Sequence, residues 1–270
     1  MKVAGAVLVL ALSGPAAAET LADYGAHASC ILAPNHVYKL SMPTQGSLAR
    51  VAVERADKIK KGAIIAELES GLEQSQLDAA RARAATDVVV KMKQAILGAA
   101  QAKVERQRTL EANHISSQQS LDEAVAAAAV ARAEVEQATL DHVLAGYEVK
   151  RMEATLARRI LRAPADGVVT AVDLHAGEYA DPTAPVATLT EIDPLKANVY
   201  LPAGAFPLVA VGMKARIAPK DPAGPEREAV VITRDPQIDA SSGLFLVELA
   251  MPNPDQSVPA GIRCAVEFAR

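Results

Sequence analysis

The sequence predicts a mixed α+β fold, in which a β-sandwich is interrupted by a long antiparallel coiled-coil hairpin and followed by a small antiparallel β-barrel. Three observations lead to this prediction. A strand-rich segment occurs twice, at an offset of 121 residues. The stretch between the two copies has the composition of long helices. The final part, residues 195–270, alternates short apolar runs with turn signals.

The repeat occupies residues 41–70 and 161–194, where the two copies align without a gap and pair Gly46 with Gly167. Each copy reads as a Pro-Gly turn, an alternating strand, a second turn and a last short apolar strand. A sheet of this size must bury its apolar face against another layer. We therefore expect the two copies to pack face to face as one sandwich.

The repeat resembles the biotinyl/lipoyl carrier fold, whose two similar halves form a flattened β-sandwich. In carrier domains the hairpin that joins the halves displays a Lys, to which the cofactor is attached. The corresponding stretch here reads Glu67-Leu68-Glu69-Ser70-Gly71 and contains no Lys. The resemblance therefore implies a lipoyl-like sandwich and disfavours a carrier subunit, because the amine that would take the cofactor is missing.

Residues 71–160 are expected to form a helical hairpin. From about residue 72 to residue 159 the chain has no Pro, and its only Gly residues are Gly98 and Gly146. Arms of roughly 42 residues would extend about 63 Å, so the hairpin should project from the sandwich rather than form a compact helical domain. Steps of three and four residues give a coiled-coil seam, expected at Leu77, Ala80, Ala84, Val88, Met92, Ala95, Ala99 and Ala102, and at Leu121, Ala124, Ala128, Ala131, Val135, Ala138, Ala145, Val149, Met152 and Leu156.

A short polar stretch, residues 111–118, interrupts the helical pattern and predicts the tip of the hairpin. Ser117 stands directly before the second helical run, which is the place of an N-cap residue.

This organisation resembles the HlyD-type membrane fusion proteins, the periplasmic adaptors of tripartite efflux and secretion pumps. The tip is also similar to the R-x3-L-x6-S pattern of members that dock on a TolC-type outer-membrane channel, with Arg106, Leu110 and Ser117 at that spacing. The resemblance implies that these residues bind the channel. Taken singly, Leu110 can also be a seam residue, Arg106 a solvated charge and Ser117 only a cap.

The same resemblance implies an inner-membrane transporter of the RND or ABC class as a second partner. It also implies a homo-oligomer, a hexameric ring that forms a sealed funnel. The alternative without a pump is an exported coiled-coil scaffold, which would have no reason to carry the tip pattern.

The barrel is expected over residues 195–270, joined by an N-terminal strand within residues 19–40, from Ala28 to Leu40. Cys30 and Cys264 then fall in its first and last strands. An oxidising compartment makes a disulfide plausible, and two separate buried thiols are the alternative.

The first residues, 1–18, have the layout of a secretory signal peptide: one Lys, an apolar run and an Ala-rich cleavage site. Ten apolar residues are too few to cross a bilayer comfortably, although an uncleaved anchor is the alternative. We therefore expect an exported, periplasmic protein that is peripheral to the inner membrane through its complex.

The composition and the residue spacing point to no catalytic, metal-binding or nucleic-acid-binding site. The net charge is −4 and no basic stripe stands out, which excludes nucleic acid as a partner. The five His residues are scattered, and neither a phosphate loop nor a nucleophile motif is present. We expect no catalytic residues, no cofactor and no metal site, and the protein is predicted not to be an enzyme.

Overall fold

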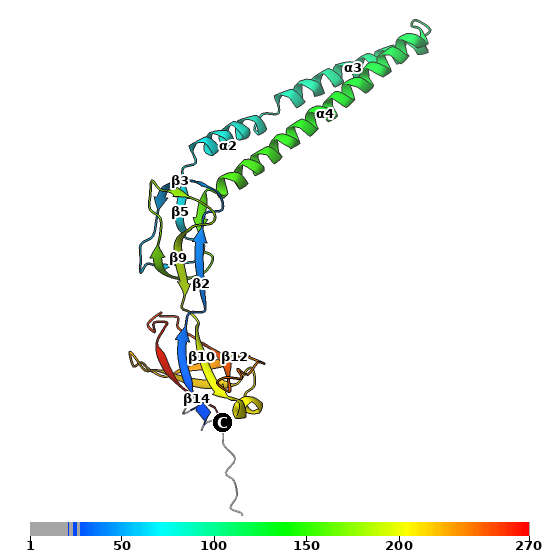
Figure 1. Ribbon diagram of the computed structural model, residues 1–270. Helices are drawn as coiled ribbons and strands as arrows, with labels where there is room; N and C mark the ends of the chain where they lie inside the picture. The colour runs from blue at the N-terminus through cyan, green and yellow to red at the C-terminus, as the bar shows by residue number, and fades with distance from the viewer. Residues whose placement is uncertain (1–20, 22–23, 26–27, 270) are drawn as a thin grey trace, which may run out of the picture.

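The computed structural model describes residues 21, 24, 25 and 28–269, so the expected signal peptide lies outside the described residues. Within them the β-sandwich lies between the barrel and the helical hairpin, and the hairpin projects away from both (Figure 1). The predicted fold class is confirmed.

The sandwich repeats strand for strand. Its strands in the described chain are β2 (His36–Ser41), β3 (Gly46–Val51), β4 (Lys58–Ile59), β5 (Ile64–Leu68), β6 (Ile160–Arg162), β7 (Gly167–Val172), β8 (Tyr179–Ala180) and β9 (Pro185–Glu191). The sheet orders are β2-β9-β7-β4 and β6-β5-β3-β8. The offset of 121 carries the first residues of β3, β4 and β5 onto those of β7, β8 and β9. The two sheets are therefore equivalent, and the predicted repeat is confirmed.

The core of the sandwich draws on both halves. Leu48 and Ile65 come from the first copy, Val169 and Leu189 come from the second, and all four are almost completely buried. Burial of one such side chain contributes about 1.5–3 kcal/mol. Each half thus depends on the other for its apolar contacts.

The two glycines that the repeat pairs both allow close approach. A Cβ on Gly46 would lie 2.8 Å from Nη1 of Arg159, and a Cβ on Gly167 would lie 2.7 Å from the Thr190 carbonyl oxygen. Gly167 therefore requires a residue without a side chain, because backbone blocks it, while a side chain at position 46 would displace the Arg159 guanidinium.

The second domain is a closed barrel with strand order β1-β10-β13-β12-β11-β14. A short 3-10 helix, η1 (Ala203–Leu208), follows β10. The strands are β1 (Ser29–Ala33), β10 (Leu195–Pro202), β11 (Lys214–Pro219), β12 (Arg227–Arg234), β13 (Leu244–Met251) and β14 (Arg263–Phe268).

The expectation of one barrel strand from Ala28 to Leu40 is wrong in its second half. The chain breaks at Pro34-Asn35, and β2 then leaves the barrel and pairs with β9 of the sandwich, with Tyr38 opposite Leu189. In the sandwich β2 takes the place that β6 takes in the other sheet. It adds the fourth strand to the sheet that contains β9, β7 and β4.

The hairpin consists of α2 (Gly71–Ala84), α3 (Val88–Ala112) and α4 (Gln118–Ala157). At 1.5 Å per residue, α4 is about 60 Å long. The first arm is not continuous, because the chain leaves the helix between Ala84 and Val88. Thr86 and Asp87 are weak helix formers, and the Asp87 carboxylate pairs with Lys91 in the first turn of α3.

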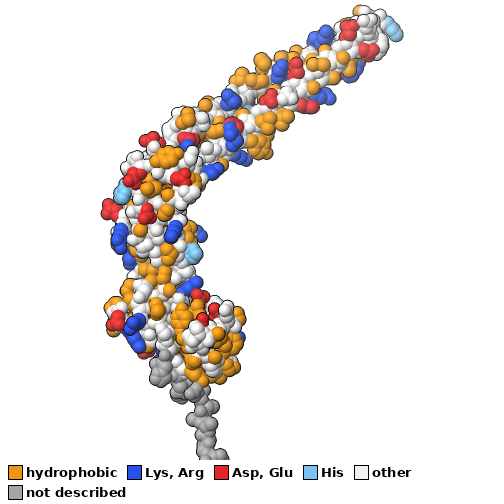
Figure 2. All heavy atoms as spheres, viewed as in Figure 1, with side chains coloured by type: hydrophobic (Ala, Val, Ile, Leu, Met, Phe, Trp, Pro, Cys, Tyr) orange, Lys and Arg blue, Asp and Glu red, His pale blue; other side chains and the backbone are white. Residues whose placement is uncertain are grey.

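The expected seam is confirmed in α4, where Ala124, Ala131 and Ala138 are buried. In α3 it is wrong from Val88 onward: Val88 and Met92 are 65% and 51% exposed. Figure 2 shows apolar side chains along the outside of the hairpin. The stripe that faces α4 is shifted and includes a Lys, and it consists of Val90, Lys93, Leu97, Ala100 and Val104.

Lys93 can occupy this seam because its ammonium group reaches Glu134 on α4 at 2.9 Å. Its aliphatic stem then covers apolar surface while its charge is neutralised at the edge. A pattern of apolar residues alone therefore predicts the wrong face of α3 as the one that contacts α4.

Arg159 ties the base of the hairpin to the sandwich. Its guanidinium pairs with Glu73 of α2 and donates to the Gln45 carbonyl oxygen at 3.1 Å. The neighbouring Arg158 donates to the Pro43 carbonyl oxygen at 3.0 Å. The backbone N–H of Glu73 and then the Arg159 guanidinium lower the pKa of the Glu73 carboxyl, against the opposing effect of burial.

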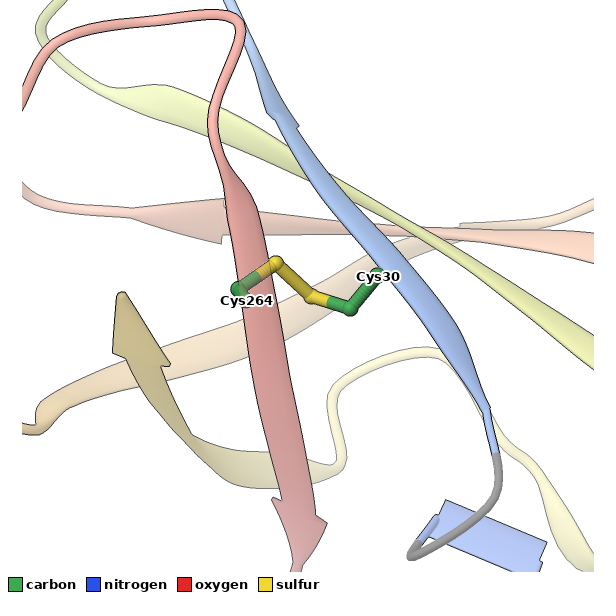
Figure 3. The surroundings of a disulfide bond; sticks show 2 residues. All are labelled: Cys30 and Cys264. Atoms are coloured by element: carbon green, nitrogen blue, oxygen red, sulfur yellow. A yellow bond between two sulfur atoms is a disulfide. The ribbon is translucent and has the colours of Figure 1, made fainter. Parts of the chain in front are cut away.

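Cys30 and Cys264 form a disulfide between β1 and β14 (Figure 3). The two residues are directly opposite in the antiparallel pair, with their Cα atoms 4.9 Å apart. The bond joins the two ends of the described chain and closes a loop with a sequence separation of 234.

None of the helices in the described ranges is long and apolar enough to serve as a membrane span.

We predict that Cys264→Ser lowers the free energy of unfolding of the barrel by about 2–4 kcal/mol, because the long closed loop is released in the unfolded chain. Denaturant unfolding followed by circular dichroism measures the change. A reductant should shift the wild-type midpoint in the same direction and leave the variant unaffected. Free thiols at both positions in peptide mapping of the purified, non-reduced protein would contradict the pairing.

We predict that Glu73→Gln loosens the hairpin base and speeds amide exchange in residues 44–47 and 71–77. Because the pKa of the Glu73 carboxyl is lowered in the fold, its ion pair stabilises the wild type above the ordinary value of 4.5 and is lost as the pH falls. Exchange measured against pH, after correction for its intrinsic pH dependence, should therefore rise in acid for the wild type only. The same acid response in both proteins would show that this carboxylate does not hold the joint.

Candidate functional site

The tip of the hairpin is a tight turn between α3 and α4. The N–H of His114 donates to the Glu111 carbonyl oxygen, and the N–H of Ile115 donates to the Leu110 carbonyl oxygen, both at 2.8 Å. His114 adopts φ +61°, the left-handed conformation that commonly ends a helix. The last turn of α3 is thus closed by the main chain of the turn itself.

The return helix begins at a side-chain cap. The Ser117 hydroxyl accepts from the N–H of Ser120 at 3.3 Å, so the N-cap expected from the sequence is confirmed. Ser116 reaches back across the turn and donates to Oε1 of Gln107 at 2.8 Å. These contacts give the turn one defined conformation although most of its side chains face solvent.

The three tip residues identified from the sequence lie on both sides of this turn. Arg106 and Leu110 are four residues apart on α3 and share one face of the helix. Leu110 is 37% exposed, and the Arg106 side chain is exposed and forms no hydrogen bond or ion pair with any described residue. Ser117 lies across the turn, with its hydroxyl also 3.1 Å from that of Ser120. Arg106 and Leu110 are therefore available to a partner, while Ser117 chiefly shapes the turn.

Ile115 is a tip residue that the sequence reasoning missed. It is 72% exposed, more than any other large apolar side chain in the described chain. The signal was present, because Ile115 is an apolar residue inside the otherwise polar stretch Asn113–Ser117. Its backbone N–H donates to the Leu110 carbonyl oxygen, so Ile115 adds a second exposed apolar side chain beside Leu110 at the tip.

The surroundings of the tip offer binding groups and no assembled chemistry. Glu105 and Arg108 pair with each other at 2.8 Å on the surface of α3. Nowhere in the part of the chain that the structure describes do three His, Cys, Asp or Glu side chains gather as a metal site would require. The arrangement suits docking: an apolar contact, an unpaired guanidinium and a rigid turn.

Comparison with known proteins gives related sequences and related folds, while a scan of protein-family models finds no match. A 214-residue stretch is 32% identical to the UPF0194 membrane protein in the asrC 5'region of Acidithiobacillus ferridurans, and covers 64% of this chain and 63% of that protein. An uncharacterized protein of Haemophilus influenzae is 23% identical over 218 residues, or 50% of its length. The chain thus spans between half and under two thirds of these two curated relatives.

Solved structures resemble the whole architecture. MacA from Actinobacillus actinomycetemcomitans matches with a TM-score of 0.73 at 18% identity, over 90% of this chain and 78% of that one. The membrane fusion protein Spr0693 from Streptococcus pneumoniae R6 matches with a TM-score of 0.54 at 12% identity, over 89% and 97% of the two chains. At these identities the matches establish the fold, and this chain has the fold of the membrane fusion proteins, as its sequence predicts.

Proposed function

We propose that this protein is a periplasmic adaptor subunit of a tripartite efflux pump. In this role it bridges an inner-membrane transporter, of the RND or ABC class, to a TolC-type outer-membrane channel. Export by its signal peptide would place it in the periplasm, peripheral to the inner membrane through its complex. Its work is mechanical and structural, and no bond is made or broken.

The observation that carries this proposal is the exposed surface at the tip. Leu110 and Ile115 present apolar side chains to solvent at the end of a long hairpin, and Arg106 beside them has an unused guanidinium. Buried carbonyl or carboxylate oxygens of a partner can satisfy such a planar, multi-donor group. A protein that docks end-on at a distance from its own globular domains needs this combination.

The hairpin has the stiffness that such a bridge needs. Lys93 and Glu134 join α3 to α4, and Arg81 pairs with Glu153 at 2.8 Å to join α2 to α4. Arg159 then anchors the base of the hairpin on the sandwich. These contacts join both segments of the first arm to α4 and the base of the hairpin to the sandwich, although each exposed ion pair contributes only about 0.2–1 kcal/mol.

The sides of the hairpin support the proposal of a ring of copies, six by family resemblance. Large apolar residues remain exposed on both helices beside the break in the first arm, where a neighbouring hairpin could cover them. They are Val88, Val89 and Met92 on α3 and Leu140, Val143, Leu144 and Tyr147 on α4.

Two alternatives have less support. A carrier subunit would need a Lys at the exit from β5, where the chain reads Glu67-Leu68-Glu69-Ser70-Gly71. A coiled-coil scaffold without a pump does not account for the two exposed apolar side chains on the rigid turn.

We predict that Arg106→Asp, Leu110→Asp and Ile115→Asp each reduce export at least about tenfold, because a carboxylate replaces a donor or an apolar contact, and about 1.4 kcal/mol of docking energy is a factor of ten. Ser117→Asp should have a smaller effect, because Asp also caps helices. Efflux of a panel of dyes and drugs is measured in cells that lack the chromosomal copy.

Thr139→Asp, an exposed position midway along α4, is the control for an added charge on the hairpin. Full export by the Arg106, Leu110 and Ile115 variants, at normal protein levels and with a substrate that the wild type exports, would refute docking through the tip.

A further inference from the structure

The sandwich and the barrel are joined by two short segments of chain. One is Pro34-Asn35, between β1 and β2, and the other is Ile192-Asp193-Pro194, between β9 and β10. Two flexible connections leave the angle between domains free to vary unless other contacts fix them. A loop of the barrel supplies such contacts.

The loop that follows β13, residues 252–258, lies against the second connection. The backbone N–H of Asn253 donates to Oδ1 of Asp193 at 2.8 Å. Its side-chain Nδ2 donates to the Ile192 carbonyl oxygen at 3.0 Å. One barrel residue thus binds two consecutive residues of the connection, through both its backbone and its side chain.

Asn253 is completely buried, and in the described chain Thr190 is the only other buried polar residue. Its amide is nevertheless fully used. Nδ2 also donates to the Val258 carbonyl oxygen at 3.0 Å, and Oδ1 accepts from the Val258 N–H at 3.2 Å and from Arg227 at 3.5 Å. A buried polar group with every partner in place is fixed in one orientation, because any rotation would leave donors or acceptors unpaired.

The loop is in turn fixed to the barrel wall. Arg227 of β12 holds both carboxylate oxygens of Asp255 at 3.1 Å, and it donates to the Ser257 hydroxyl at 2.8 Å and to the Pro252 carbonyl oxygen at 3.2 Å. Lys58 of the sandwich reaches the Asp255 carbonyl oxygen at 3.5 Å. A continuous set of hydrogen bonds therefore runs from a barrel strand, through the loop, to the connection.

We propose that Asn253 is a positioning residue that holds the sandwich at a fixed angle to the barrel. Its consequence for export rests on the proposed function, since the barrel would face the transporter and the hairpin tip would face the channel. A change of about 10° at this joint would move the tip by at least about 10 Å, because the sandwich lies between the joint and a hairpin about 60 Å long (Figure 1). A displacement of that size would take the tip away from its docking position.

The test is Asn253→Asp in the full-length exported protein, with the native disulfide kept. The substitution preserves shape and replaces the two N–H donors with an oxygen that repels the Ile192 and Val258 carbonyl oxygens. Spin labels at His175→Cys in the sandwich and Glu228→Cys on the barrel, both exposed, report the distance between the domains by double electron–electron resonance. We expect a single narrow distance in the wild type and a distribution at least twofold broader, or shifted, in the variant.

Asn198→Asp is the matched control, because it puts the same charge on β10, where the side chain forms no hydrogen bond with either connection among the described residues. It should keep the wild-type distance. Asp193→Ala removes the acceptor of the Asn253 N–H and should broaden the distance distribution as Asn253→Asp does. If Asn253→Asp does not fold, the Asp193→Ala result alone tests the proposal. Folded variants at both positions with the wild-type distribution would overturn the proposal.

The distance measurement needs no pump partner, so its outcome is separate from that of the tip variants. An altered distance with full export would support the role of Asn253 in the joint and would overturn its consequence for export.

Discussion

The pairing of β5 with β6 is the constraint on which the shape of this protein depends. The hairpin starts directly after β5 and ends directly before β6, and these strands are antiparallel neighbours with Glu67 opposite Ile160 at the hairpin end. Adjacent strands lie about 4.8 Å apart, so the two ends of the insertion emerge side by side, and α2 and α4 must begin as an antiparallel pair. The sandwich can therefore carry a hairpin of any length, and Arg159 adds the orientation by binding Glu73 and the Gln45 carbonyl oxygen.

Small buried residues and single polar contacts have different roles along the molecule. Buried alanines such as Ala124 and Ala131 let the helices approach closely and stiffen the arm. Lys93 and Arg159 supply the specific contacts that the small residues cannot give. Arg159 binds the base of the hairpin to the sandwich, and Asn253 binds the barrel to the connection that leads to the sandwich. The chain thus has three parts, with specific polar contacts along the hairpin and at the two joints.

Much of the fold could be read from the sequence because it rests on local pattern. The offset between Gly46 and Gly167, the alternation in the barrel strands and the cap at Ser117 all appear in the structure at the expected places. The candidate site was found in part: Arg106 and Leu110 by family resemblance, while Ile115 was overlooked. Ile115 matters at the tip because its side chain is exposed, and a single apolar residue in a polar stretch of sequence does not reveal whether it is exposed or buried.

The sequence by itself determined the order of the parts, the equivalence of the two sandwich halves and the position of the tip, because each follows from periodicity, turn residues or repetition along the chain. Only the tertiary structure decided which sheet takes β2, which stripe of α3 faces α4 and what holds the domains together. These outcomes depend on partners far away in the chain: β9 for β2, Glu134 for Lys93, and Ile192 and Asp193 for Asn253. From the sequence alone, a Lys in a helix seam and a fully buried Asn would each destabilise the fold. They stabilise it only because the folded chain brings their hydrogen-bond and ion-pair partners into place.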